Sequence, residues 1–153
     1  MEFVCHQRST WALICVLCIF IAGCDILSLE DRPTKIRDLI EQNLENWNEN
    51  DIQSYRFDYN KTVGDTEIND VQVTLQEGRI DTVLVEGEGV ENPDDFLTID
   101  RLYDEIIENF EREDRGDFQV SFDQQLSYPT LYRMLPGQAT EGRSVEVTDF
   151  ELL

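Results

Sequence analysis

The chain has 153 residues, of which 41% are hydrophobic and 10% aromatic, so it can bury the core of one ordinary domain and is not a disordered chain. It carries 33 acidic and 12 basic residues, a net charge of −21. This charge argues against a nucleic-acid partner, because phosphate binding needs a basic surface.

The chain begins with a short apolar run, "WALICVLCIFIA", at residues 11–22. A membrane-spanning helix needs about 20 apolar residues and the core of a signal peptide about 7 to 15, so this run predicts a signal peptide. The next tetrapeptide, Ile21-Ala22-Gly23-Cys24, resembles a bacterial lipobox. The resemblance implies cleavage between Gly23 and Cys24 and acylation of Cys24. A short uncleaved signal anchor and ordinary secretion are the alternatives.

The predicted organisation is therefore a lipoprotein signal peptide at residues 1–23, a tether at 24–32 and a single α+β domain at 33–153. Acylated Cys24 would attach the domain to a membrane of the bacterial cell envelope, on a periplasmic or outer-surface face, through two or more acyl chains. The sequence does not decide between inner and outer membrane.

A first helix is predicted from about residue 33 to 48. Pro33 suits its first turn. Apolar residues then recur at helical spacing: Ile36, Leu39, Ile40, Leu44 and Trp47.

Three strands are predicted next. Tyr55, Phe57 and Tyr59 alternate with polar residues, as in a half-buried strand. The segment from 71 to 75 repeats that alternation, and Glu77-Gly78 supplies a hairpin turn before a third strand at 80–85.

An acidic loop follows, "EGEGVENPDDF" at residues 86–96. Hard cations bind several oxygens, so this loop is a weak candidate for calcium binding. Its carboxylates are Glu86, Glu88, Glu91, Asp94 and Asp95. Their spacing does not match an EF-hand, and an exposed loop without a metal is the favoured interpretation.

A second helix is predicted after Thr98, a suitable N-cap, with an apolar stripe from Ile99 to Phe110. Three further strands are expected at 118–122, 130–135 and 144–152.

The order αβββαβββ predicts an antiparallel sheet of about six strands with both helices packed on one face. It also prompts a hypothesis of internal duplication, because the segments starting at Ile36 and Ile99 align with five identical positions. Any two amphipathic helices followed by strands could align this well, so both explanations stay open.

All four cysteines lie within the first 24 residues and the only histidine is His6. The mature chain therefore cannot form a Ser-His-Asp triad, a thiol redox centre or a zinc site with nitrogen or sulfur ligands. We expect no enzyme, no cofactor and no metal. Paired carboxylates, as in glycoside hydrolysis, are the one catalytic route left.

Three segments carry a resemblance to a known family: "TIDRLYDEI" at 98–106, "VSFDQQLSYPTLYRM" at 120–134 and "VEVTDFEL" at 145–152. They resemble bacterial lipoproteins grouped as domain of unknown function 6174. Many members carry a Cys-x-Cys-like pair after the first strand, and residues 60–64 here contain no cysteine. The family has no established activity, so the resemblance implies architecture and localisation only.

Within these segments, Tyr128-Pro129 is the best local candidate for a ligand contact, because an X-Pro step holds Tyr128 in an extended geometry. A hairpin connector is the favoured alternative for this pair. The function predicted from the sequence is a lipid-anchored, non-enzymatic binding or structural module of the cell envelope. The alternatives are a small hydrolase with paired carboxylates and an inhibitor-like or chaperone-like domain that binds proteins.

Overall fold

The computed structural model describes residues 32–112, 117–136 and 141–153. Residues Thr34–Leu153 form one compact unit that contains the whole hydrophobic core cluster, from Ile40 to Val147. This unit therefore has its own core, as an independently folding domain requires. The predicted signal peptide, Gly23 and Cys24 lie outside the described residues.

Both predicted helices are confirmed. Helix α1 spans Arg32–Glu49 and buries Ile40 and Trp47, which are seven residues apart and so lie on one helix face. Helix α2 spans Ile99–Glu111. The hydroxyl of Thr98 caps it by accepting a hydrogen bond from the backbone N–H of Arg101 at 3.2 Å.

The six predicted strands are also present, and a seventh is added. The strands are β1 (Tyr55–Val63), β2 (Thr66–Gln76), β3 (Arg79–Val85), β4 (Glu88–Gly89), β5 (Phe118–Phe122), β6 (Pro129–Met134) and β7 (Arg143–Leu152). Strand β4 and a short 3₁₀ helix, η2 (Pro93–Asp95), lie in the acidic loop expected to be irregular. A strand of two residues is too short to show a period-two pattern, so the sequence could not reveal it.

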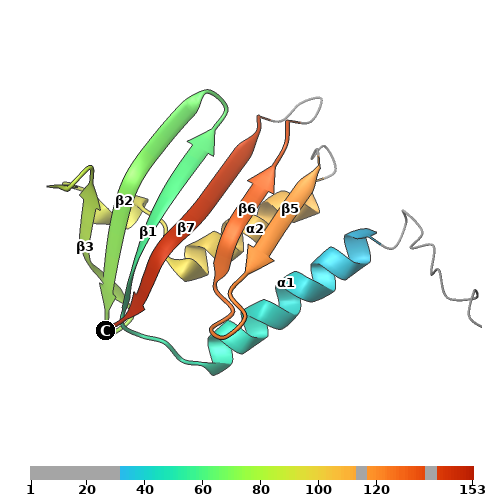
Figure 1. The fold of residues 1–153 in the computed structure, drawn as a ribbon, viewed down its shortest axis with the longest axis horizontal. Coiled ribbons are helices and arrows are strands. Elements are labelled where there is room, and N and C mark those ends of the chain that lie inside the picture. The colour runs from blue at the N-terminus through green and yellow to red at the C-terminus, as the bar shows by residue number, and fades with distance from the viewer. Residues whose placement is uncertain (1–31, 113–116, 137–140) are drawn as a thin grey trace, which may run out of the picture. The chain divides into compact units, whose positions relative to one another are not determined.

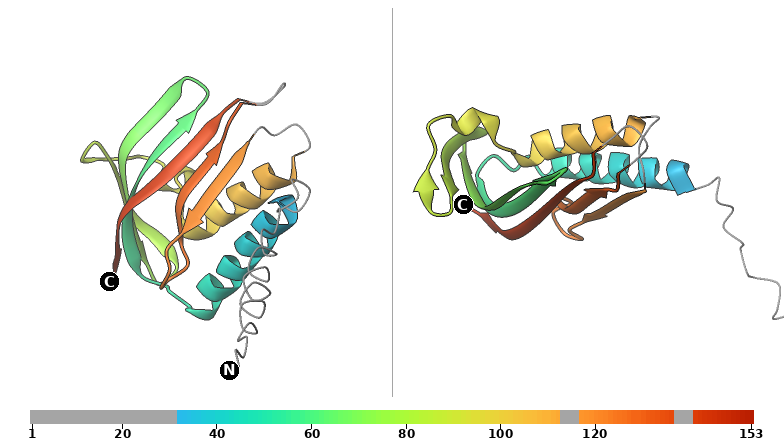
Figure 2. Two further views of the ribbon diagram at one scale, coloured as in Figure 1. Left: turned by 45° about the vertical axis from the view of Figure 1, so that its right-hand side comes forward. Right: turned by 90° about the horizontal axis from the view of Figure 1, so that it is seen from above.

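The seven strands form one antiparallel sheet in the order β4-β3-β2-β1-β7-β6-β5 (Figure 1). The first and last strands of the domain, β1 and β7, are neighbours at its centre. Both helices cover the same face of the sheet, and the other face is open (Figure 2). The helices run antiparallel, since Arg37 of α1 pairs with Glu111 of α2 while Trp47 bonds to Asp100.

Inward-facing side chains of the sheet build the core against the helices. They are Tyr55, Phe57 and Tyr59 of β1, Val71, Val73 and Leu75 of β2, Val83 of β3, Tyr132 and Met134 of β6, and Val145 and Val147 of β7. The alternate positions are polar: Asp58 of β1, for example, accepts a hydrogen bond from Gln72 of β2 on the open face. The wetter second face expected from the strand pattern is therefore present.

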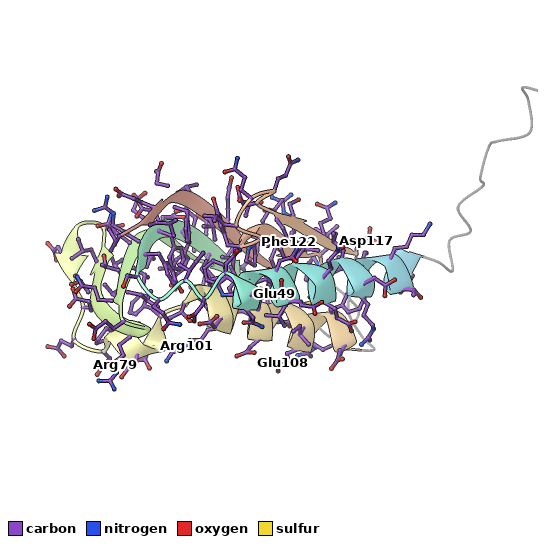
Figure 3. The ribbon with its side chains drawn as sticks, turned by 90° about the horizontal axis from the view of Figure 1, so that it is seen from below. Glu49, Arg79, Arg101, Glu108, Asp117 and Phe122 are labelled. Atoms are coloured by element: carbon purple, nitrogen blue, oxygen red, sulfur yellow. The ribbon has the colours of Figure 1, made fainter. Side chains whose placement is uncertain are left out.

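Trp47 connects α1 to the rest of the domain. Its indole lies edge-on to Tyr55 at 5.6 Å and to Phe150 at 6.1 Å between ring centres. The indole N–H donates to the carboxylate of Asp100, at the start of α2, at 2.8 Å. The outer surface of the two helices carries exposed carboxylates, among them Glu49 and Glu108 (Figure 3).

The sheet order argues against internal duplication. The path β1-β2-β3 crosses the sheet in the same direction as the path β5-β6-β7. Successive antiparallel pairings make β5 run opposite to β1. The two halves therefore add their strands in the same direction across the sheet but start from strands of opposite orientation. Because helices cover the same face of both halves, this arrangement gives the two halves opposite handedness. No rotation superposes the two halves strand for strand, so the sequence similarity reflects two amphipathic helices followed by strands.

Candidate ligand-binding site

A hollow lies at one end of the sheet, where the β1–β2 turn meets the end of β6 and the start of β7. Its volume is about 480 Å³, within the range of roughly 300–1,000 Å³ typical of small-ligand sites. Its lining comprises Thr62, Gly64, Asp65, Arg133, Met134, Leu135, Pro136, Glu141, Gly142, Arg143 and Ser144. None of these residues was singled out from the sequence as a ligand contact.

Glycine is favoured at one of the turns that frame the hollow. The backbone N–H of Gly64 donates to the carbonyl of Gly142 at 2.9 Å, which joins the β1–β2 turn to the start of β7. Gly64 has φ +58°, and a Cβ there would lie 3.2 Å from Oε2 of Glu141. A side chain at this position would be strained and would also displace the Glu141 carboxylate.

Four charged residues line the hollow without neutralising one another. Arg133 and Arg143 are the basic residues of the lining, and Asp65 and Glu141 are the acidic ones. Among the residues that the structure describes, no nitrogen of either arginine lies within 4.0 Å of either carboxylate. The two arginines point to opposite faces of the sheet, because Arg133 alternates with buried Tyr132 and Met134 whereas Arg143 is turned toward α2.

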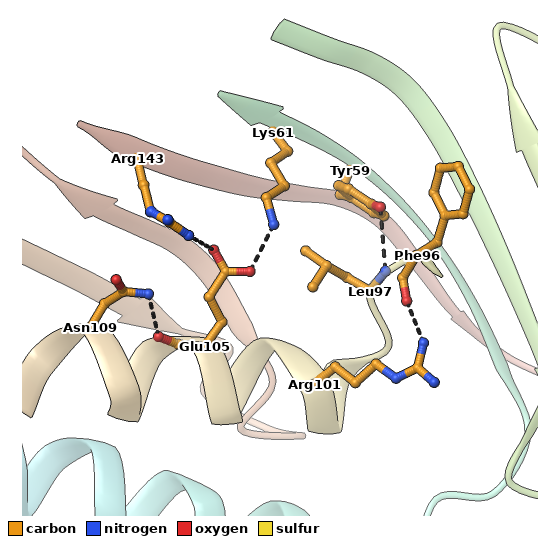
Figure 4. Close-up of polar contacts among 8 residues, drawn as sticks. All are labelled: Tyr59, Lys61, Phe96, Leu97, Arg101, Glu105, Asn109 and Arg143. Carbon is orange, nitrogen blue, oxygen red and sulfur yellow. Dashed lines mark hydrogen bonds and ion pairs between the residues drawn. The ribbon is translucent and has the colours of Figure 1, made fainter. Parts of the chain in front are cut away.

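A largely buried polar cluster lies between α2 and the sheet (Figure 4). Nζ of Lys61 on β1 is 2.7 Å from Oε2 of Glu105 on α2, and the two side chains are only 20% and 14% exposed. Nη1 of Arg143 lies 3.7 Å from Oε1 of the same carboxylate, too far for a hydrogen bond. Glu105 thus faces two cations, one hydrogen-bonded and one held only by charge.

Two buried oxygens in this region have no hydrogen-bond partner among the described residues: Oε1 of Glu105 and the hydroxyl of Tyr132. Burial raises the pKa of the Tyr132 hydroxyl, and the negative charge of Glu105 raises it further. Buried polar groups without partners are uncommon in folded proteins. This cluster is therefore the least satisfied part of the core.

The tyrosines of β1 have a structural role instead. The hydroxyl of Tyr55 accepts from the backbone N–H of Ile99 at 3.1 Å, and that of Tyr59 accepts from Leu97 at 3.4 Å. Burial raises the pKa of both hydroxyls. Together they fix the chain where it enters α2.

The structure places Tyr128-Pro129 at the β5–β6 hairpin. Ser127 has φ +64°, and the carbonyl of Tyr128 accepts from the backbone N–H of Asp123 at 2.9 Å, which closes the turn. The Tyr128 ring stacks on Phe150 with 4.2 Å between ring centres, and Pro129 is buried. This geometry suits the hairpin-connector interpretation; a ligand contact at Tyr128 stays a prediction.

The acidic loop does not gather its carboxylates. Its five acidic residues, Glu86, Glu88, Glu91, Asp94 and Asp95, are all exposed. Among the described residues, no group of three or more potential ligand side chains could hold a metal ion. The loop is an exposed connection in which these carboxylates form no such group.

A second hollow, of about 300 Å³, lies beside Trp47 and also contains two carboxylates, Asp51 and Asp100. Each of them already accepts a structural hydrogen bond, Asp51 from Gln53 at 2.7 Å and Asp100 from Trp47. Both acids thus take part in structural hydrogen bonds near the end of α1.

The sequence contains a signal for this polar cluster that hydrophobic periodicity alone does not detect. Lys61 follows Tyr55, Phe57 and Tyr59 at the same parity, so it faces inward. Arg143 precedes Val145 and Val147 in the same way, and Glu105 lies on the buried side of α2. Charged residues at inward positions of three elements mark a polar cluster, but only the pairing of β1 with β7 brings them together.

No helix among residues 32–112, 117–136 and 141–153 is long and apolar enough to cross a membrane. Neither a curated protein nor a solved structure matches the chain significantly. A family of unknown function, DUF6174, matches residues 39–152, which is most of the folded domain. The resemblance found in the sequence is thereby confirmed at the level of the family. The chain belongs to the DUF6174 family of unknown function.

Proposed function

We propose that this protein is a lipid-anchored component of the bacterial cell envelope whose domain acts as a non-enzymatic binding module. The observation that carries the proposal is the sequence Ile21-Ala22-Gly23-Cys24 at the end of a twelve-residue apolar run. Cys24 is the last cysteine of the chain, and a tether of a few residues separates it from α1. Acyl chains on Cys24 would hold the domain at a membrane surface.

Two features support binding as the role of the domain. Beyond residue 24 the chain has no thiol or imidazole to activate a nucleophile. The hollow at the end of β1, β6 and β7 is lined by charged side chains and backbone turns, which are groups that can recognise a ligand.

A hydrolase with paired carboxylates is the second candidate, because Asp65 and Glu141 line the same hollow. Both are exposed residues, whereas the general acid of such an enzyme is kept protonated by an apolar environment. This difference favours binding over hydrolysis.

The anchor is tested by labelling a bacterial host with a tagged fatty acid. Wild-type protein and a Cys18→Ser variant should both incorporate the label, whereas Cys24→Ser should not. Cys18 is the matched control, because it lies inside the apolar run and outside the lipobox. Equal labelling of all three proteins, or of none, would contradict attachment at Cys24.

A further inference from the structure

We propose that strand β5, at the edge of the sheet, binds an extended segment of a basic partner protein, which joins the sheet as one more antiparallel strand. In this arrangement the backbone of the segment pairs with β5 and its apolar side chains pack over α1. Its basic side chains lie against the acidic surface around this edge. The inference rests on the binding role proposed above, for which it names the partner, but not on the lipid anchor.

The two edges of the sheet differ in how they are protected. At one edge, β4 pairs with Leu84 and Val85 of β3, and η2 also contacts β3. At the other edge, β5 has a neighbouring strand on one side only, and its sequence Phe-Gln-Val-Ser-Phe contains no lysine or proline (Figure 1). Lysine and proline are common safeguards of edge strands, and an edge strand without them pairs readily with another chain.

The hydrogen bonds around β5 show which of its backbone groups point outward. The carbonyl of Asp117 and the N–H of Asp123, on either side of the strand, each form a 2.9 Å bond toward β6. Alternate residues of an antiparallel strand bond to the same neighbour, so Phe118, Val120 and Phe122 turn their N–H and C=O groups away from β6. No described residue bonds to these groups. They form a row of donors and acceptors that matches an extended polypeptide backbone.

The side chains of the same three residues make this edge apolar on its inner face. Phe118, Val120 and Phe122 pack against the core and remain partly exposed. Seen from below, Asp117 and Phe122 both lie beside α1, so β5 runs along the helix (Figure 3). Because side chains alternate along a strand, every second side chain of an added segment would point toward α1 and lie next to these three residues.

The side of α1 that is turned away from α2 is uncharged. Arg37 and Glu41 mark the side toward α2, since Arg37 pairs with Glu111 and Glu41 lines a small hollow with Phe110. On the opposite side lie Leu39, which is 41% exposed, and Asn43, whose side-chain amide donates to the Leu39 carbonyl at 2.8 Å.

An apolar side chain from an added strand would find Leu39 available for packing. Leu39 and the inner face of β5 together form an uncharged margin on a chain in which 29% of the residues are charged. Depletion of charge is typical of the core of a protein interface.

The surrounding charge selects the partner. The chain has a net charge of −21, and exposed carboxylates flank the uncharged margin, among them Asp117, Asp38 and Glu45. Charges of a partner are felt over about 8 Å at physiological ionic strength, so basic residues at the ends of the segment are attracted. A second copy of this chain carries the same net charge and is repelled, which favours a basic partner over self-association.

The experiment uses the fragment 25–153, which contains the compact unit and its core. The probe is the capped peptide acetyl-Lys-Val-Thr-Val-Thr-Val-Lys-amide, titrated into the isotope-labelled fragment and followed by two-dimensional NMR. We expect shift changes in β5 and around Leu39. The amide protons of Phe118, Val120 and Phe122 should exchange with solvent about tenfold or more slowly when the peptide is bound, because each gains a hydrogen-bond acceptor.

Three modified peptides test the pairing and the charge. The valines of the probe share the inner face with the apolar residues of β5, so their N–H groups point toward β5. Methylation of the three valine nitrogens should weaken binding about tenfold or more, because donors to β5 are lost. Methylation of the threonine nitrogens, which point away, is the matched control and should leave binding unchanged. A peptide with glutamates in place of the lysines should bind about tenfold more weakly at low salt, and the difference should shrink as salt is added.

Variants of the protein test the two sides of the binding edge. Leu39→Lys should weaken binding of the lysine peptide about tenfold, because it removes an apolar contact and adds a like charge. Ile68→Lys is the matched control, since Ile68 lies on β2 with 40% exposure and the net charge changes equally. Val120→Pro removes one outward N–H, which an edge strand tolerates, and should weaken binding more than Val120→Ala, which keeps it.

Three results would overturn the proposal: no shift changes at millimolar peptide, shift changes centred away from β5, or equal binding of the two N-methylated peptides. Slow exchange of the outward amides in the free fragment, increasing with its concentration, would also overturn it by showing that a second copy occupies the edge. The peptide comparisons use the unaltered fragment, so they do not depend on whether a variant folds. Failure here would leave fatty-acid labelling of Cys24 unchanged, so the partner and the anchor are judged separately.

Discussion

Replacing Trp47 with alanine should lower the free energy of unfolding by about 3–5 kcal/mol, the usual cost of truncating a buried tryptophan. The side chain is 3% exposed. Its edge-on contacts with Tyr55 and Phe150 account for about 0.5–1.5 kcal/mol each beyond buried area. Its hydrogen bond to Asp100 adds about 1 kcal/mol, because Asp100 is exposed and returns to water when the bond is lost.

The assay is urea unfolding of the fragment 25–153, followed by circular dichroism. Trp47→Phe keeps a ring and loses the hydrogen bond to Asp100, so it should fall between wild type and Trp47→Ala. Leu39→Ala on the same helix is the control, since Leu39 is 41% exposed and should cost less than about 0.5 kcal/mol. If Trp47→Ala were no more destabilising than Leu39→Ala, α1 would not be docked through this residue and the packing described above would be refuted.

Three other predictions concern the polar groups of the core. Tyr132→Phe should leave the free energy of unfolding unchanged or raise it by up to about 1 kcal/mol, because it removes a buried hydroxyl without a partner among the described residues. A clear decrease of this free energy in urea unfolding would show that the hydroxyl is hydrogen-bonded. A double-mutant cycle for Lys61 and Glu105, which are largely buried, should give a coupling energy above about 1 kcal/mol. The exposed pair Arg56 and Glu151 should give a smaller coupling energy. Equal coupling energies would contradict the burial assigned to the first pair. Burial raises the pKa of all five tyrosine hydroxyls, so their contribution to stability is complete below the unfolded value of about 10 and is lost as pH rises above it. Tyrosinate absorbance should therefore appear together with unfolding in an alkaline titration, and independent ionisation near pH 10 with an intact circular dichroism spectrum would contradict this.

The helices and most strands could be predicted because their signals are local. Pro33 and Thr98 mark helix starts, and the alternation around Phe57 marks a strand. Glu77 and Gly78 both have positive φ, as the predicted hairpin turn requires.

The candidate site could not be predicted because it depends on a long-range pairing. Thr62 and Ser144 are neighbours only because β7 returns to pair with β1, which no local pattern reveals. Hydrophobic periodicity also identifies only the apolar positions that form a core. It therefore passed over Arg133 and Arg143, two charged residues of the lining.

Mass spectrometry of the N-terminal peptide of the protein purified from a bacterial envelope is the direct test of lipid attachment at Cys24. We predict that the mature chain begins at Cys24 and that its mass includes a diacylglycerol on the sulfur, with or without a further acyl group on the amine. A chain that retains residues 1–23, or that begins at another residue with Cys24 unmodified, would contradict the proposal that this domain is held at a membrane by a lipid.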